Sequence, residues 1–199
     1  MDMAGGYLKA VKQWAPQAEI VFDRFHVERL MTDAVDAVRR ALVRDRADRA
    51  EAASVKKLRY VLLKNPQHLS VLEETRWSEV ERQHRRLHRA YLLKEAFAEA
   101  LELEDPELAE WALRQWLAWA SRSRLKPFVK AARTVRRHFA GILAYVQTRC
   151  TNAIVEGFNT RLRLIARRAF GFHSTRPLIA LLFLTRGGIQ LNPPLPTRT

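Results

Sequence analysis

Residues 18–43 read AEIVFDRFHVERLMTDAVDAVRRALV, and this stretch decides the class of fold that we expect. Its first five residues form a short apolar run of the kind that predicts a buried strand, at 18–22. From Asp23 onward the apolar residues recur at intervals of three and four, which predicts a helix with one buried face. Asp23 is expected to cap that helix. The apolar positions of the helix are Val27, Leu30, Met31, Ala34, Val35 and Val38.

The sequence on both sides of this stretch favours helices. Residues 5–15 have helical spacing and are followed by Pro16, which ends the helix. Residues 44–148 show helical periodicity and no strand signal, so we expect four or five helices there, arranged as a bundle-like subdomain. One of these helices is expected to begin with Asp105 and Pro106 and to place three aromatic side chains in the core: Trp111, Trp116 and Trp119.

The charge of the chain indicates a polyanionic partner. Lys and Arg number 35 against 21 Asp and Glu, which gives a net charge of +14. Nucleic acid is the commonest partner of such a chain, and a surface that only aids solubility is the alternative. Cys150 is the only cysteine, so an internal disulfide and a thiolate zinc cluster are excluded, which fits a reducing cytoplasm. No signal peptide is recognisable, and the apolar run at 179–184 is too short to span a membrane.

The stretch TNAIVEGFNTRLRLIARRAFGF, residues 151–172, contains one acid, Glu156, and four arginines. It predicts a helix that Asn152 caps and Gly171 ends. Glu156, Asn159, Arg163 and Arg167 share one face of that helix, at spacings of three, four and four. Glu156 either stabilises the helix dipole or binds a metal ion beside cationic groups that hold a phosphate backbone.

Three residues near the start of the chain could take part in the same chemistry. Asp23 and His26 are three residues apart, and they are either a cap with a histidine packed beneath it or two metal ligands that need further partners. Asp2 precedes two glycines, a setting that suits the edge of an active site or a chain end with no role. The sequence contains no GxxxxGK phosphate loop and no GxSxG elbow, which excludes many classes of enzyme.

Several blocks of the chain together resemble one family of proteins. They are residues 1–40, 58–70, 87–101 and 151–172, including the motif DRFHV and the motif N-x-x-V-E-G-x-N followed by RR-x-x-G. In combination they resemble the ISL3-type insertion-sequence transposases, also called the IS204/IS1001/IS1096/IS1165 family. The resemblance extends to about Gly188.

The resemblance implies a DDE transposase with an RNase H-like core, in which two aspartates and a glutamate hold two divalent ions, Mg²⁺ or Mn²⁺. Such ions activate water or a DNA 3′-OH for attack on a phosphodiester. By motif, Asp2 matches the second carboxylate and Glu156 the third, with Asp23 as the alternative to Asp2. Asp23, His26 and Asn159 then support the site. The DNA-binding residues are Arg161, Arg163, Arg167 and Arg168.

The resemblance also implies the organisation and partners of the chain. We expect a mainly α-helical chain with one or two strands: a partial RNase H-like core at 1–45, an all-α insertion at 46–148, returning core helices at 149–188 and a disordered tail at 189–199. DNA, as transposon ends and target, is the expected partner, with a homodimer as a family expectation, no membrane, and a location in the bacterial cytoplasm at the nucleoid.

One departure from the family pattern bears on activity. The first catalytic aspartate, the early strands and an amino-terminal zinc-binding and helix-turn-helix region have no match here. We therefore expect a fragment that is inactive alone, and the alternative is a non-catalytic basic helical DNA-binding protein or a transposase remnant.

Overall fold

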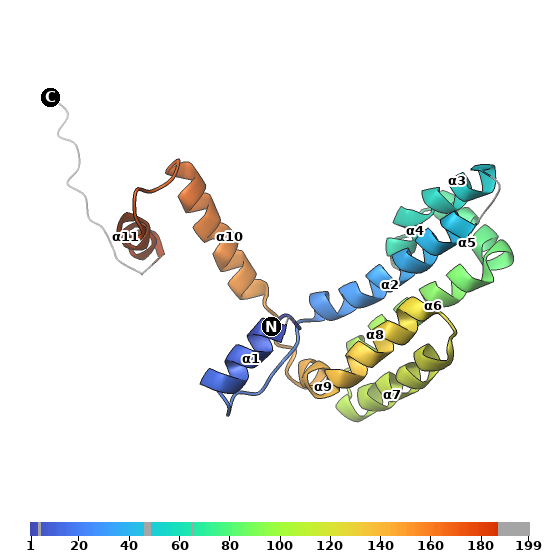
Figure 1. Cartoon of the computed structure of the whole chain (residues 1–199), viewed down its shortest axis with the longest axis horizontal. Helices are drawn as coiled ribbons and strands as arrows, with labels where there is room; N and C mark the ends of the chain where they lie inside the picture. The colour runs from blue at the N-terminus through green and yellow to red at the C-terminus, as the bar shows by residue number, and fades with distance from the viewer. Residues whose placement is uncertain (4, 46–48, 65, 187–199) are drawn as a thin grey trace. The chain divides into compact units, whose positions relative to one another are not determined.

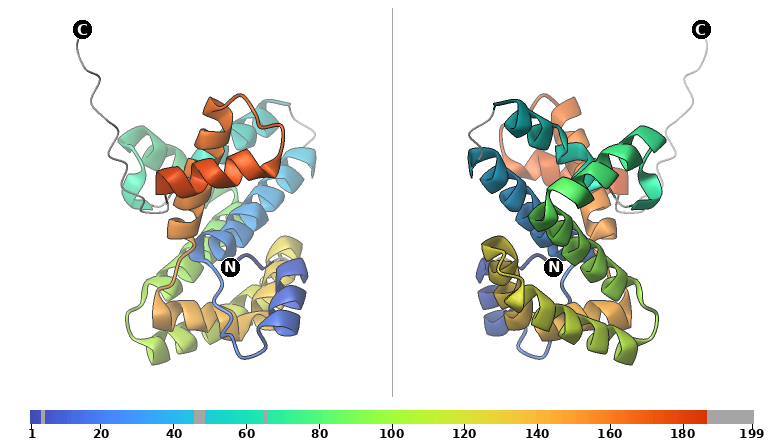
Figure 2. Two further views of the ribbon diagram at one scale, coloured as in Figure 1. Left: turned by 90° about the vertical axis from the view of Figure 1, so that its left-hand side faces the viewer. Right: turned by 90° about the vertical axis from the view of Figure 1, so that its right-hand side faces the viewer.

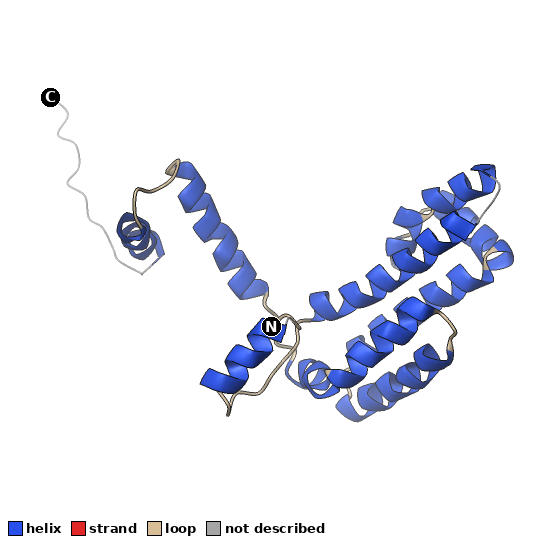
Figure 3. Cartoon of the chain, viewed as in Figure 1, coloured by secondary structure: helices blue, strands red, loops and turns tan. Residues whose placement is uncertain are grey.

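The chain is described here from a computed structural model, which covers residues 1–3, 5–45, 49–64 and 66–186. Within these ranges it forms eleven α-helices and one short 3₁₀-helix, and none of the described residues is in a strand (Figure 3). The expectation of a mainly α-helical chain is confirmed. No helix in the described ranges is long and apolar enough to cross a lipid bilayer.

The helices belong to two compact units, residues 1–151 and residues 152–199. The first unit contains α1 to α9 and the second contains α10 and α11 (Figure 1). The bounds are α1 Gly5–Trp14, α2 Arg24–Asp45, α3 Arg49–Lys57, α4 Arg59–Leu63, the 3₁₀-helix η1 Pro66–His68, α5 Val71–Gln83, α6 Arg85–Glu102, α7 Pro106–Arg122, α8 Lys126–Arg137, α9 Phe139–Thr148, α10 Ala153–Arg168 and α11 Thr175–Arg186.

Four helices form the centre of the first unit. Helix α2 packs against α6 and α8, and α7 packs against the same two helices, so that the four enclose one core (Figure 2). The described residues in 49–64 and 66–148 form seven α-helices, which is more than the four or five expected from the sequence. The largest completely buried side chains of this core include Met31, Leu87, Phe97, Leu113 and Phe128.

Local sequence signals account for the helix boundaries. The carboxylate of Asp105 accepts a hydrogen bond from the backbone N–H of Glu107 at 2.9 Å, and Pro106 follows at the first helical position of α7. Ser70 and Glu73 form a capping box at the start of α5. The cap predicted at Asp23 is also present, because its Oδ1 accepts from the Phe25 N–H at 2.9 Å.

The strand predicted over 18–22 is wrong. The end of this segment has no regular secondary structure, and it pairs with a single residue at the start of the chain. The Met1 amino group donates to the Val21 carbonyl at 2.7 Å, and the Asp23 N–H donates to the Met1 carbonyl at 3.0 Å. Met1 takes part in both bonds, and their partners are the residues on either side of Phe22. This is the hydrogen-bond pattern of parallel strands. One residue of pairing is too little for a strand.

The prediction of three core tryptophans in α7 is also wrong in part. Trp116 is buried, and its indole N–H donates to the Leu93 carbonyl at 2.7 Å. Trp111 is 60% exposed and Trp119 is 38% exposed. The buried face of α7 instead contains Ala109, Leu113, Trp116, Leu117 and Ala120, and the small alanines allow α6 and α8 to approach closely. The predicted tail at 189–199 lies outside the described residues.

Candidate functional site

Asp2, Asp23 and His26 lie together at the start of α2. The His26 ring stands between two carboxylates: its Nδ1 is 3.5 Å from Asp23 Oδ1, and its Nε2 is 3.9 Å from Asp2 Oδ2. Asp23 is buried, whereas the Asp2 side chain is 44% exposed. The buried Nδ1 of His26 makes no hydrogen bond to any described residue. The structure therefore brings together three of the residues that the sequence singled out.

The backbone sets this arrangement. Pairing of Met1 with the segment before α2 places Asp2 beside the first turn of that helix. Helix α1 connects the two paired segments, and a right-handed crossover helix between parallel segments is the usual connection of this kind. Gly141 of α9 completes the support, because its carbonyl accepts from the Phe22 N–H at 3.0 Å.

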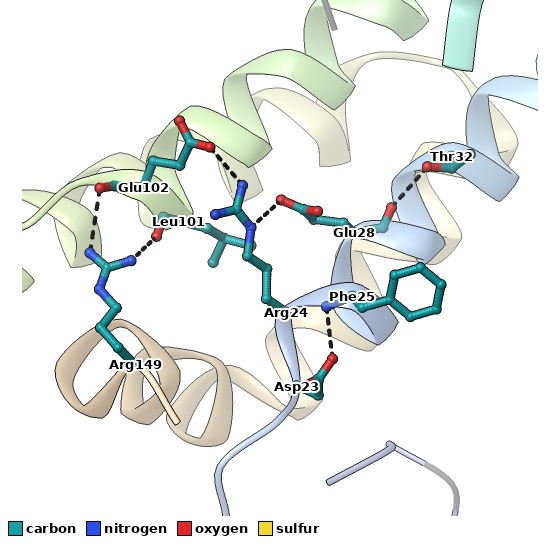
Figure 4. Close-up of polar contacts among 8 residues, drawn as sticks. All are labelled: Asp23, Arg24, Phe25, Glu28, Thr32, Leu101, Glu102 and Arg149. Carbon is teal, nitrogen blue, oxygen red and sulfur yellow. Dashed lines mark hydrogen bonds and ion pairs between the residues drawn. The ribbon is translucent and has the colours of Figure 1, made fainter. Parts of the chain in front are cut away.

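Two arginines that the sequence analysis did not select bind the end of α6 near Asp23, and they are Arg24 and Arg149 (Figure 4). Arg24 donates to Glu28 on its own helix and to Glu102 at the end of α6, each at 2.7 Å. Burial alone would lower the pKa of Arg24, but the hydrogen bonds to both glutamates outweigh it and raise that pKa. The spacing of Arg24 and Glu28 is a readable signal, whereas nothing local predicts Glu102.

Arg149 is the second of these arginines. It has a left-handed backbone, with φ of 53°, at the end of α9. Its guanidinium donates to the Leu101 carbonyl at 2.6 Å and also to the carbonyls of Glu102 and Leu103. These carbonyls lie at the carboxyl end of α6, where backbone acceptors lack helical partners. No sequence signal near Arg149 predicts this contact, because its partners are more than 45 residues away.

The cluster by itself does not fit a metal ion. Asp23 uses Oδ1 to cap α2, and the imidazole Nε2 faces the Asp2 carboxylate. Within the described residues, no three His, Cys, Asp or Glu side chains form a group that could hold a metal. A metal ion at Asp2 would therefore need ligands from outside the cluster.

The remaining residues singled out by the sequence lie on α10, in the second unit. Glu156, in the first turn, and Asn159 are exposed, as are the arginines at 161, 163, 167 and 168. Because one continuous helix covers residues 153–168, Glu156, Asn159, Arg163 and Arg167 do share a face. Arg161 and Arg168 are seven residues apart and form a separate stripe. Asn152 is the N-cap residue of this helix, as the sequence predicts.

The chain is similar to known transposases over most of its length. The family model of the ISL3 DDE transposases, described as "Transposase", matches residues 1–182. The transposase for insertion sequence element IS1557 of two Mycobacterium tuberculosis strains is 33% identical over 219 residues, covering 99% of this chain and 49% of the relative. The transposase for IS1001 of Bordetella parapertussis is 29% identical over 174 residues, covering 86% and 43%. No solved structure matches. The chain spans about half the length of these curated relatives.

Proposed function

This chain belongs to the ISL3 family of transposases, and from that premise we propose that it carries two of the three carboxylates of a DDE active site on an RNase H-like core. Asp2 would be the second carboxylate and Glu156 the third. The observation that carries the proposal is the grouping of Asp2, Asp23 and His26 at the start of α2. Its substrate would be the DNA of an insertion element and of the target.

The backbone around Asp2 supports an RNase H-like core. Met1 and Phe22 pair in the parallel manner, α1 connects them, and α2 follows at once. This order is that of a strand, a crossover helix and a second strand. In an open sheet of this kind, functional residues gather at the carboxyl ends of the strands. Asp2 and Asp23 would both lie at such ends.

The residues of the cluster divide into two roles. Asp2 is the more exposed of the two aspartates and would be a metal ligand together with Glu156. Asp23 caps α2, and His26 lies within 4 Å of both carboxylates, so these two residues would orient Asp2. A bound Mg²⁺ or Mn²⁺ ion would supply Lewis-acid chemistry at a phosphodiester. Asn159 would support Glu156 from the same face of α10.

The experiment that tests the proposal measures metal binding and stability on matched variants. Glu156 and Glu107 both lie in the first turn of a helix, so each can stabilise its helix dipole by about 0.3–1 kcal/mol. We expect Mn²⁺ titration calorimetry to detect binding that Asp2→Asn and Glu156→Gln weaken and Glu107→Gln leaves unchanged. Equal, small effects of both glutamate variants on stability, with Mn²⁺ affinity unaffected, would leave Glu156 with only the dipole role.

Catalysis requires a third carboxylate in this proposal. Asp2 and Glu156 are two ligands, and we expect the purified chain alone to show no Mg²⁺-dependent strand cleavage or transfer on DNA carrying element ends. Activity of the chain alone would contradict this expectation. The proposed cellular setting is the bacterial cytoplasm at the nucleoid, with a second copy of the chain as a further partner.

A second candidate function is non-catalytic DNA binding. The observation in its favour is that Asp23 has a structural role as a helix cap, and that the cluster alone does not fit a metal ion. DNA binding without any Mn²⁺ binding at Asp2 or Glu156 would select this function. The arginines of α10 would then be the retained part of the machinery.

A further inference from the structure

The positive charge of this protein is concentrated in one part of the chain. Residues 111–199 contain 16 Lys and Arg and a single acid, Glu156, whereas residues 1–110 contain 19 Lys and Arg and 20 acids. Seven of the 16 cations lie between Arg122 and Arg137, in a stretch without any acid. The α10 arginines therefore do not account for most of the basic excess, and the end of α7 together with α8 is a second concentration of it.

Helix α8 arranges its cations as one stripe. Lys126, Lys130, Arg133 and Arg137 follow one another at spacings of four, three and four, which places them on one face of the helix. All four side chains are exposed. At about 1.5 Å per residue the stripe is about 16 Å long, which is comparable to the rise of about five base pairs along the DNA axis at about 3.4 Å each.

The cations of the stripe are not paired with acids in the described part of the chain. None of the ion pairs found there involves a cation of α8. On α2, which packs against α8, Asp33 and Asp36 lie beside arginines of their own helix. On α7 the neighbouring Glu110 pairs with Arg114. Glu19 lines a cavity that Arg137 and Lys12 also line, and it is the one acid there.

The stripe is unfavourable for the helix on its own. Like charges three and four residues apart on a helix repel one another, and a cation in the first turn opposes the helix dipole. The first turn of α8 contains no acid, and its N-cap Leu125 contributes no side-chain hydrogen bond. Arg137 lies in the last turn and complements the dipole, so phosphate groups placed along the stripe would relieve the repulsion and the effect of Lys126 in the first turn.

We propose that the Lys126–Lys130–Arg133–Arg137 stripe of α8 is a second DNA-binding surface, which grips the phosphate backbone independently of α10. The proposal rests on the proposed function for the identity of the polyanion as DNA. A lipid surface fits less well, because an interfacial helix must insert its apolar face. The apolar face of α8, with Phe128, Ala131, Ala132 and Val135, is buried in the core.

The test compares three variants of the full chain for duplex DNA affinity from 50 to 300 mM salt, a range of about sixfold. The α8 variant is K126Q/K130Q/R133Q/R137Q and the α10 variant is R161A/R163A/R167A/R168A. The control variant K57Q/R82Q/R85Q/R86Q removes the same number of exposed charges from α3, α5 and α6. We expect the α8 variant to bind at least about tenfold more weakly near 100 mM salt, and its salt slope to fall by about 0.9 for each phosphate that it no longer neutralises.

A second readout separates loss of binding from loss of folding. Because the loss of repulsion along α8 offsets the loss of the Arg137 charge from the last turn, the α8 variant is expected to melt at no lower a temperature than the wild type when no DNA is present. DNA should raise the melting temperature of the wild type more than that of this variant.

Four outcomes would contradict the proposed DNA-binding role of α8. Equal losses of affinity in the α8 and control variants would mean that only net charge matters. Weaker binding by the α10 variant with normal binding by the α8 variant would overturn the surface too, while leaving the proposed function intact. Absence of DNA binding by the wild type would overturn both. If the α8 variant lost binding to phosphatidylserine vesicles to the same extent as binding to DNA, the stripe would be assigned to anionic headgroups instead.

Discussion

Gly141 lies where a helix contacts the segment that leads into the candidate site. A Cβ atom on this residue would stand 2.5 Å from two ring carbons of Phe22 and 2.8 Å from the Ile20 carbonyl oxygen. The same Phe22 ring contacts the His138 ring edge-on, with their centroids 5.1 Å apart. Burial, followed by the charge of Arg137, lowers the pKa of His138. The close approach of α9 therefore depends on the missing side chain of Gly141.

Gly141→Ala is expected to destabilise the protein by about 1–3 kcal/mol, because the extra methyl group forces Phe22 or the backbone to move. Urea unfolding followed by circular dichroism measures this change. Gly157→Ala, in α10, is the matched control, since no atom lies within 4 Å of its added Cβ. There the substitution should be neutral or stabilising by up to about 1 kcal/mol. Equal effects at both positions would contradict the packing described here.

Glu73 has the clearest acid-dependent role among the described residues. A hydrogen bond from Lys64, followed by one from the Ser70 N–H, lowers the pKa of Glu73 to about 2. Because the folded pKa lies below the ordinary value near 4.5, the stabilisation is present above pH 4.5 and is lost as the pH falls toward 2.

Glu73→Gln should therefore lower the free energy of unfolding at neutral pH and flatten its dependence on pH between about 4.5 and 2. Chemical denaturation at a series of pH values measures both quantities. Glu74→Gln, in the same first turn of α5, serves as the control. An unchanged pH profile for the Glu73 variant would show that its capping box contributes nothing.

At the scale of elements, the long-range contacts of Arg149 join two helix ends. This residue follows α9 and donates to carbonyls at the end of α6, while Arg24 at the start of α2 pairs with Glu102 beside it (Figure 4). Three elements distant in sequence are thus connected close to the Asp2–His26 cluster. These connections fix the start of α2, where Asp23 and His26 lie, against the ends of α6 and α9.

Arg149→Ala is expected to cost about 1.5–3 kcal/mol, the range for hydrogen bonds to a charged group. Arg29→Ala removes an exposed ion pair with Asp33, which is four residues away on α2, and should cost only about 0.3–0.5 kcal/mol. Thermal and urea unfolding of the two variants give the comparison. If the two substitutions cost the same, Arg149 does not cap α6.

At the scale of the whole molecule, the second unit differs in character from the first. No described side chain of α10 is buried, and large apolar side chains of this unit are exposed, among them Phe158, Leu164, Phe170 and Phe183. The first unit encloses its core within four helices, whereas the second contributes the α10 arginines and Glu156. Stability is therefore expected to depend mainly on the first unit, and the contribution of the α10 arginines to DNA binding is expected to be separable from it.

We expect DNA binding to weaken for every DNA sequence when Ala replaces the four α10 arginines, Arg161, Arg163, Arg167 and Arg168. The slope of log affinity against log salt concentration should fall by about 0.9 for each phosphate that is no longer neutralised. Stability should change little, because all four side chains are exposed. Fluorescence anisotropy with labelled duplexes of different sequence, at several salt concentrations, measures the effect. Unchanged binding would mean that these arginines are only solvated.

The sequence by itself determined the mainly helical class, several of the helix caps and the family. The period of three and four after Asp23, the Asp105–Pro106 start and the combined motifs around Glu156 are local patterns, and a helix forms its hydrogen bonds locally. The family resemblance singled out Asp2, Asp23, His26 and Glu156 as expected site residues, and it left open how the first three would meet.

Only the tertiary structure decided the contacts between distant residues. It buried Trp116 and left Trp111 and Trp119 exposed, because the neighbouring helices cover only one side of α7. It limited the predicted strand to one paired residue, since a strand needs a partner that its own sequence does not specify. It also placed Asp2 against His26 and Arg149 against α6. Each of these contacts depends on the packing of segments far apart in the chain, which periodicity within a segment does not encode.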